Sequence, residues 1–104
     1  MINKVASIAM TDKELTTHVK EILGKYLPGR RVFYFFGSRA TGRHTDRSDY
    51  DFGIDTGEKI PLELMCKMKE ELERLPTLHR IDLVDFQRVS STFSNYAKRN
   101  AILL

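Results

Sequence analysis

The sequence is poor in cysteine and has no long apolar run, and each absence excludes a class of protein. Its one cysteine, Cys66, has no partner for an internal disulfide and cannot build a Cys-based zinc site. Cys66 falls in a helical pattern, so we expect it to be a buried or half-buried small hydrophobe. No stretch approaches the length of a membrane span, and residues 1–10 lack the apolar run of a signal peptide. The sequence therefore predicts a soluble protein of the cytoplasm.

A large excess of charge of one sign is also missing. The net charge of +3, from 17 basic and 14 acidic residues, is too small to indicate a nucleic-acid-binding protein by itself. Residues 29–47, however, contain one acidic residue and five arginines, which are Arg30, Arg31, Arg39, Arg43 and Arg47. Arginine prefers phosphate and carboxylate partners. Without the motif that lies beside it, a solvated basic loop would be the favoured interpretation of this cluster.

The chain contains no internal repeats and no low-complexity linker, and its 104 residues correspond to one domain. Residues 1–10 show no clear period, so we treat them as an N-terminal tail and residues 11–104 as the domain. A hydrophobic fraction of 41% can fill one small core. A domain of this size has little room for both a catalytic platform and a separate substrate-binding domain.

Hydrophobic periodicity predicts six main elements. The first is a helix that begins at Thr11, where Thr11 and Glu14 form a capping box, and ends at Pro28. The others are a strand at residues 31–36, a strand at 48–56, a helix at 60–75, a strand at 78–86 and a helix at roughly 91–100. A short helix starting at Ser38 and a short strand or interface at residues 102–104 are further candidates.

This order of elements predicts an α/β fold of the α+β kind, with a small mixed sheet, helices packed on one face and the other face open. The strand at residues 31–36 is apolar at nearly every position, which is typical of a central strand covered on both faces. In the last helix the positions expected to face inward are Phe93, Tyr96, Ala97 and Ala101.

Two carboxylates, Asp49 and Asp51, lie one residue apart in the second predicted strand, and the alternation of the strand places both on the open face of the sheet. Asp82 lies in the middle of the third strand, whereas Asp85 has the opposite parity and ranks lower. Carboxylates within apolar strands are costly unless a cation is bound to them. We therefore expect Asp49, Asp51 and Asp82 to form one acidic cluster.

Oxygen ligands of this kind suit Mg²⁺ or Mn²⁺, which also bind substrate phosphates. The Gly37-Ser38 turn directly follows the first strand, where backbone N–H groups and the Ser38 hydroxyl could hold phosphates, and Arg39 and Arg43 could assist. The combination indicates metal-assisted transfer of a nucleotidyl or phosphoryl group. The competing interpretation is a set of solvated acids on a sheet face, because an isolated D-x-D pair is a weak signal.

The motif GSRATGRHTDRSDYD, residues 37–51, resembles the signature of the DNA polymerase beta-like nucleotidyltransferase superfamily, and the chain looks most like its minimal nucleotidyltransferases over about residues 11–104. The resemblance implies a nucleotidyltransferase-like palm in which Asp49 and Asp51 bind metal ions. It also implies that Asp82 is the third carboxylate, which helps to deprotonate or orient the attacking hydroxyl. Gly37 and Ser38 would contact the triphosphate of the nucleotide.

Minimal members of this family lack a substrate-binding domain and are often paired with a helical protein of the HEPN or substrate-binding type, sometimes as antitoxin and toxin. The resemblance thus implies a Mg²⁺-dependent enzyme that transfers NMP, AMP from ATP above all, to a hydroxyl on such a partner. One alternative is a binding module that neutralises the partner by contact alone. Another is a small-molecule nucleotidyltransferase of the antibiotic-modifying type, for which a homodimer would have to build the acceptor pocket. A nucleic-acid polymerase is disfavoured, because the chain has no room for a duplex-gripping domain.

Overall fold

The computed structural model of the protein describes residues 10–104. The predicted N-terminal tail lies, apart from Met10, outside the described residues. The elements are, in chain order, α2 (Asp12–Tyr26), β1 (Val32–Phe36), α3 (Ser38–Thr41), β2 (Tyr50–Asp55), α4 (Leu62–Leu72), β3 (Ile81–Asp85), α5 (Ser91–Arg99) and β4 (Ile102–Leu103). Within the described part of the chain, no helix is long and apolar enough to cross a membrane.

The strands form one four-stranded sheet in the order β3-β2-β1-β4, which confirms the predicted mixed sheet. β1 pairs antiparallel with both β2 and β4, and β2 pairs parallel with β3. β1 is thus an inner strand, as its continuous apolar run predicts. β3 is an edge strand and is shorter than the predicted strand at residues 78–86, because turns and bends extend as far as His79.

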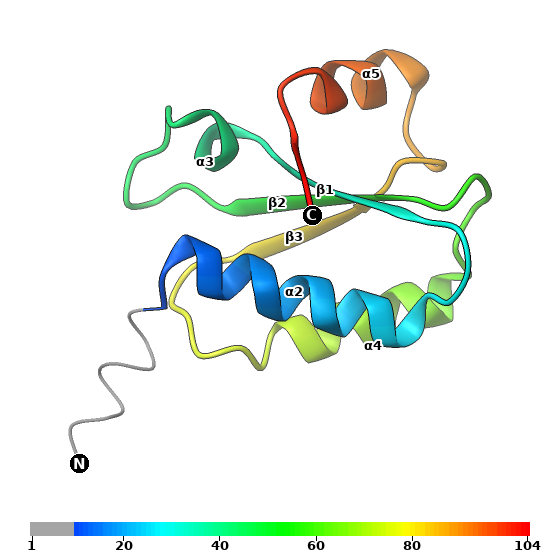
Figure 1. The fold of residues 1–104 in the computed structure, drawn as a ribbon, viewed down its shortest axis with the longest axis horizontal. Helices are drawn as coiled ribbons and strands as arrows, with labels where there is room; N and C mark the ends of the chain where they lie inside the picture. The colour runs from blue at the N-terminus through cyan, green and yellow to red at the C-terminus, as the bar shows by residue number, and fades with distance from the viewer. Residues whose placement is uncertain (1–9) are drawn as a thin grey trace.

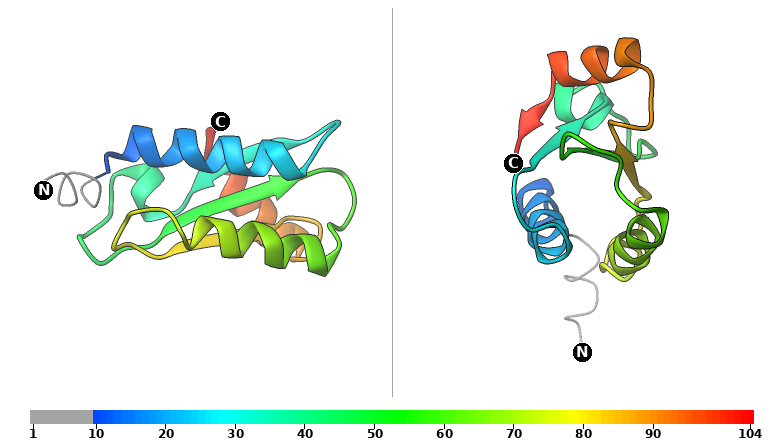
Figure 2. Two further views of the ribbon diagram at one scale, coloured as in Figure 1. Left: turned by 90° about the horizontal axis from the view of Figure 1, so that it is seen from below. Right: turned by 90° about the vertical axis from the view of Figure 1, so that its right-hand side faces the viewer.

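Two helices cover one face of the sheet and a third lies on the other face (Figure 1). α2 and α4 pack side by side, and Figure 2 shows the sheet between these two helices and α5. The core between the helix pair and the sheet includes Leu15, Val19, Leu23, Phe52, Ile54, Met68 and Leu72. The expected layer of helices on one face is therefore present as α2 and α4. The opposite face is only partly open, because α5 covers the part of it around Phe36 and Phe86.

Local signals set the start of α2 and the length of α4. The backbone N–H of Glu14 donates to Thr11 Oγ1 at 3.2 Å, and the N–H of Thr11 donates to Glu14 Oε1 at 2.9 Å, so the predicted capping box forms. α4 starts later than predicted because Pro61, with ψ of 136°, precedes the helix as its N-cap. The prediction for Cys66 is wrong: this residue is exposed, because the buried side of α4 runs through Met65, Met68 and Leu72.

α5 approaches the sheet through small residues, and its aromatic side chains stay at the surface. Ser94 and Ala97 are its buried residues, and Ala101 packs beside them as predicted. Tyr96 is 65% exposed and Phe93 is 40% exposed, so the prediction that both face inward is wrong for Tyr96 and only partly right for Phe93. The ring of Phe93 meets Phe36 edge-on at a centroid distance of 6.1 Å. The small residues bring the helix axis close to the sheet, which leaves no room beneath for a second large ring.

Candidate active site

Two carboxylates from neighbouring strands lie side by side on the face of the sheet that carries α5. In the strand register, Asp51 of β2 is opposite Asp82 of β3 on one side and opposite Phe36 of β1 on the other. Phe52, which has the opposite parity, is fully buried in the core beneath α2 and α4. Asp51 and Asp82 are both half-buried, so they are desolvated in part and still accessible to a ligand.

The Gly37-Ser38 turn is in contact with Asp51, and only glycine fits there. Gly37 has a φ of +85°, and a Cβ atom on it would lie 2.3 Å from Asp51 Oδ2. Ser38 then begins α3, a single helical turn that ends at Gly42 with a φ of +80°, as the short helix predicted after the first strand requires. The turn and the acidic strand, 14 positions apart in the sequence, therefore form one surface.

The electrostatics at Asp51 favour a bound cation. Burial, followed by the negative charges of Asp82 and Asp49, raises the pKa of Asp51 from 3.8 to about 6, while the positive charge of Arg80 opposes this rise. A carboxylate in this state gains stability from any cation that neutralises it. Carboxylates with raised pKa values are concentrated at binding and catalytic sites.

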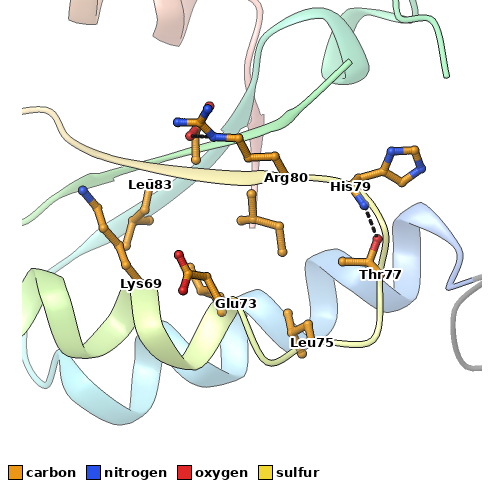
Figure 3. Close-up of a pocket in the computed structure, with 10 residues that line it drawn as sticks. Lys69, Glu73, Leu75, Thr77, His79, Arg80 and Leu83 are labelled. Atoms are coloured by element: carbon orange, nitrogen blue, oxygen red, sulfur yellow. Dashed lines mark hydrogen bonds and ion pairs between the residues drawn. The ribbon is translucent and has the colours of Figure 1, made fainter. Parts of the chain in front are cut away.

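Asp82 forms an ion pair with a neighbouring arginine and lines a cavity at the edge of the sheet. Arg80 Nε donates to Asp82 Oδ1 at 2.9 Å (Figure 3), and the Arg80 side chain is 74% exposed. The cavity, of about 280 Å³, lies between β3 and α4, and its polar lining consists of Lys69, Glu73, Thr77, His79, Arg80 and Asp82. Because Arg80 is so exposed, it can swing away from Asp82 at small cost.

Asp49 lies just before β2, is half-buried, and acts on Asp51 through its charge. Among residues 10–104, no three acidic, histidine or cysteine side chains are close enough together to hold a metal ion between them. The donor set nevertheless fits a hard divalent cation: it consists of oxygen atoms only, and the charge at Asp51 is not neutralised. Asp51 and Asp82 would hold such an ion, and the negative charge of Asp49 would add to its attraction.

The structure gives Arg39 a different task from the phosphate contact suggested by its place in the basic loop. Its Nε donates to the carbonyl of Ser48 at 2.9 Å, and one terminal nitrogen donates to the carbonyl of Thr45 at 3.2 Å. Its guanidinium also lies over the ring of Tyr50, 4.4 Å from the centroid. These contacts of Arg39 stabilise the loop that leads to Asp49. We therefore leave Arg39 out of the proposed phosphate site.

Tyr50 extends this network and was missed by the sequence analysis. Its hydroxyl donates to Asp12 at the start of α2 and accepts from Arg39 at 3.3 Å. Burial, followed by the bond to Asp12, raises the pKa of Tyr50 to about 12. The position of Tyr50, as the single aromatic residue between Asp49 and Asp51, could have drawn attention to it. Its partners Asp12 and Arg39 come from distant parts of the sequence, so the sequence alone does not predict these contacts.

Arg43, the second arginine suggested for phosphate, is exposed at another cavity. This cavity has a volume of about 420 Å³ and lies on the β1 side of Asp51, where Gly37 and Ser38 line it together with residues of α5. This cavity lies on the face of the sheet that carries α5, whereas the cavity along β3 lies on the side of α4. Arg43 lines this cavity together with Gly37 and Ser38 and remains a candidate for phosphate binding.

Two other acids of the strands have structural tasks. Asp55, on the same face as Asp51, accepts from Lys98 Nζ at 2.7 Å and from Gln87 Nε2 at 2.9 Å. Asp85 is 3% exposed and accepts from the backbone N–H of Ile60 at 2.8 Å. Asp85 thus belongs to the opposite face, as its parity in the sequence predicts.

Comparison with known proteins gives the class of this fold and site. The sequence model of the family described as polymerase beta, nucleotidyltransferase matches residues 17–104, and the chain belongs to this family. Within it, the chain is a minimal nucleotidyltransferase of the polymerase beta-like superfamily. A solved structure assigned as a minimal nucleotidyltransferase is 26% identical, with a TM-score of 0.69, and the match covers 88% of this chain and 94% of that one.

Two further solved structures are toxin–antitoxin complexes. In one, from Shewanella oneidensis, a tri-AMPylated HEPN toxin is bound to an MNT antitoxin; the identity is 18%, the TM-score is 0.63, and the match covers 89% of this chain and 71% of that one. The other contains AMP-PNP; the identity is 21%, the TM-score is 0.64, and the match covers 84% and 69%. At these identities the likeness concerns the fold. No curated protein matched the chain.

Proposed function

We propose that this protein is a Mg²⁺-dependent nucleotidyltransferase that transfers AMP from ATP to a hydroxyl group on a helical partner protein of the HEPN type. The observation that carries the proposal is the Asp51–Asp82 pair in register across β2 and β3, with the Gly37-Ser38 turn against Asp51. Mn²⁺ would serve the same donor set.

The residues would divide the reaction between them. The Ser38 hydroxyl and the backbone of the turn bind the phosphates that leave as pyrophosphate, and Arg43 adds a positive charge beside them. Asp49, Asp51 and Asp82 would hold the divalent ion, which supplies charge neutralisation for the phosphates and for the attacking oxygen. Asp82 orients the acceptor hydroxyl and accepts its proton. The acceptor oxygen forms a bond to the α-phosphorus as the bond from that phosphorus to pyrophosphate breaks.

The cavity along β3 supports an approach of the acceptor from that side. It is lined by Asp82 and lies at the edge of the sheet, where a hydroxyl on another protein can enter. Lys69 and Arg80 contribute positive charge to its lining, and Glu73 and Asp82 contribute negative charge. An AMPylated HEPN toxin bound to an MNT antitoxin of similar fold supports a partner of that type.

The experiment is an AMP-transfer assay with labelled ATP, Mg²⁺ and the candidate partner. Label should appear on the partner with the wild-type protein and should be lost with Asp49→Ala and with Asp51→Ala. Glu70→Gln, an exposed acid on α4, is the matched control and should leave transfer unchanged. Transfer that survives both aspartate substitutions would rule out the mechanism.

A second candidate function is neutralisation of the partner by contact alone. The apolar end of the chain favours it, because Ile102 and Leu103 on the edge strand β4 are 49% and 65% exposed. Such an edge can pair with another chain. If Asp51→Asn still co-purifies with the partner and still neutralises it, contact is sufficient; if neutralisation is lost while the complex persists, transfer is required.

A further inference from the structure

The guanidinium of Arg39 is fully engaged within the protein, although the side chain is only half-buried. Its Nε atom donates to the carbonyl of Ser48 at 2.9 Å, and one terminal nitrogen donates to the carbonyl of Thr45 at 3.2 Å. The same terminal nitrogen lies 3.4 Å from Nδ1 of His79, and the other donates to the hydroxyl of Tyr50 at 3.3 Å. All three nitrogens therefore have partners in the fold, with which a phosphate would have to compete.

These contacts hold the chain on both sides of Asp49. On one side, the Ser48 carbonyl accepts from Arg39. On the other side, the ring of Tyr50 lies against the guanidinium, with its centroid 4.4 Å away, and the N–H of Tyr50 donates to the carbonyl of Arg80 at 2.9 Å. Asp49 thus has an anchored residue before it and another after it.

Arg39 also links this segment to the strand of the third carboxylate. His79 lies just before β3, the strand that carries Asp82. The ring of His79 meets the ring of Tyr50 edge-on at a centroid distance of 5.5 Å, and its Nδ1 faces the Arg39 guanidinium. One side chain therefore connects the loop before β2 with the start of β3.

Arg39 makes these connections without neutralising a carboxylate. Within the part of the chain that the structure describes, it forms no salt bridge, whereas Lys98 binds Asp55 directly. A guanidinium that binds backbone carbonyls holds the loop in place and leaves the charge of Asp49 available to an ion. Groups that orient metal ligands in this way typically contribute to metal affinity.

We propose that Arg39 is a positioning residue of the metal site, which fixes Asp49 for binding the divalent ion by holding the residues before and after it. This inference rests on the proposed function, because it takes Asp49 as a ligand of that ion. Loss of the guanidinium should therefore impair the use of Mg²⁺ and leave the affinity for ATP nearly unchanged.

The first measurement needs neither metal nor nucleotide. The amides of Ser48 and Tyr50 both donate to backbone carbonyls, so their hydrogen exchange in the metal-free protein, followed by NMR, reports how firmly the loop is held. Arg39→Ala should speed this exchange by about tenfold and change exchange in α4 by less than about twofold. Arg47→Ala, which removes an exposed arginine of the same loop, is the matched control and should change neither. Unchanged exchange in Arg39→Ala would overturn the proposal.

The second measurement separates a positioning role from a phosphate contact. In the AMP-transfer assay, Arg39→Ala should raise the Mg²⁺ concentration for half-maximal rate by about tenfold and change the KM for ATP at saturating Mg²⁺ by less than about twofold. Arg39→Lys should behave like Arg39→Ala, because one ammonium cannot bind two carbonyls and lie flat against a ring. A raised KM for ATP that Arg39→Lys restores, with an unchanged Mg²⁺ requirement, would make Arg39 a phosphate ligand and overturn the proposal.

The remaining outcomes are also decisive. A merely structural role would lower the amount of folded protein, measured by circular dichroism, and leave both the Mg²⁺ requirement and the KM unchanged. If Arg39→Ala does not fold, Arg39→Lys takes its place in both measurements. Wild-type protein that transfers no AMP would overturn the proposed function, whereas the exchange measurement still decides whether Arg39 holds the loop before β2.

Discussion

The two ends of β2 carry acidic residues in opposite electrostatic states. Asp51 and Asp55 point to the same face of the strand, because their positions differ by an even number. At Asp55 the hydrogen bond from Lys98 holds the pKa below its ordinary value of 3.8. At Asp51 burial and two neighbouring acids raise the pKa to about 6. The fold supplies a cation to the carboxylate that ties α5 to the sheet. It leaves the carboxylate beside the Gly37-Ser38 turn free to bind a cation from solution.

The largest expected difference between the two ends is in AMP transfer. We expect Asp51→Ala to lower the rate by about a thousandfold, since a carboxylate that holds the ion contributes several kcal/mol to transition-state stabilisation. Asp55→Ala should lower it by less than about tenfold, through weaker attachment of α5. Initial rates of label transfer, normalised to folded protein by circular dichroism, measure both. If both variants lose a similar fraction of the transfer rate, Asp51 has no greater part in catalysis than Asp55.

The next effect is on stability and compares the glycines beside each acid. Gly37 and Gly57 have φ values of +85° and +87°, but only at Gly37 would a Cβ clash, with Asp51. Gly57→Ala should cost about 1 kcal/mol from backbone strain alone, and Gly37→Ala about 2–3 kcal/mol. Urea unfolding of both variants measures the difference. Equal costs would show that the carboxylate of Asp51 moves away freely, which would contradict a preformed contact.

A smaller loss of stability is expected from Asp55→Asn, because it removes the partly buried bond to Lys98. We expect a cost of about 1–2 kcal/mol in urea unfolding at neutral pH, and less than about 0.5 kcal/mol for the exposed control Glu63→Gln. The folded-state pKa of Asp55 is lowered, so the stabilisation is present above its unfolded value and is lost as the pH falls through the folded value. The difference between wild type and Asp55→Asn should therefore disappear in acid. If the difference in stability between wild type and Asp55→Asn persists in acid, its cause is packing rather than charge.

The sequence was sufficient to predict the acidic face but not the surroundings of each acid. The period of two in residues 48–56 places Asp51 and Asp55 on one face whatever the tertiary structure, and the same rule puts Asp85 on the other. Whether an acid on that face is neutralised depends on side chains from other elements. Lys98 reaches Asp55 from 43 residues away, and no local pattern marks that contact.

The same limit explains why the sequence did not predict the contacts of Arg39 or the exposure of Tyr96 in α5. An arginine in a basic loop can bind phosphate or the carbonyls of its own loop, and Arg39 binds those of Thr45 and Ser48. In α5, hydrophobicity alone favours a buried Tyr96, whereas the close approach of the helix to the sheet selects Ala97 for the contact. In both cases several partners compete for one side chain or one contact. Tertiary structure, and not local propensity, determines which of them is chosen.

The smallest expected effect has the opposite sign at the two ends of β2. The folded-state pKa of Asp51 is raised above its ordinary 3.8 to about 6, so protonation favours the folded state, and this stability is lost as the pH rises from 3.8 through about 6. The asparagine in Asp51→Asn cannot ionise, so this variant does not lose stability as the pH rises. In EDTA, which keeps divalent ions from masking the effect, the variant should gain about 1 kcal/mol over wild type between pH 4 and pH 7.5, since solvent screens a half-buried group. Asp55→Asn should stay less stable than wild type by a nearly constant amount over the same range, because the stabilisation by Asp55 is already present above pH 3.8 and falls away only below it. Thermal unfolding of both variants and of wild type at the two pH values measures these differences in stability. If Asp51→Asn is less stable than wild type at pH 7.5, a cationic side chain of the protein already neutralises Asp51. An ion would then have no electrostatic reason to bind there.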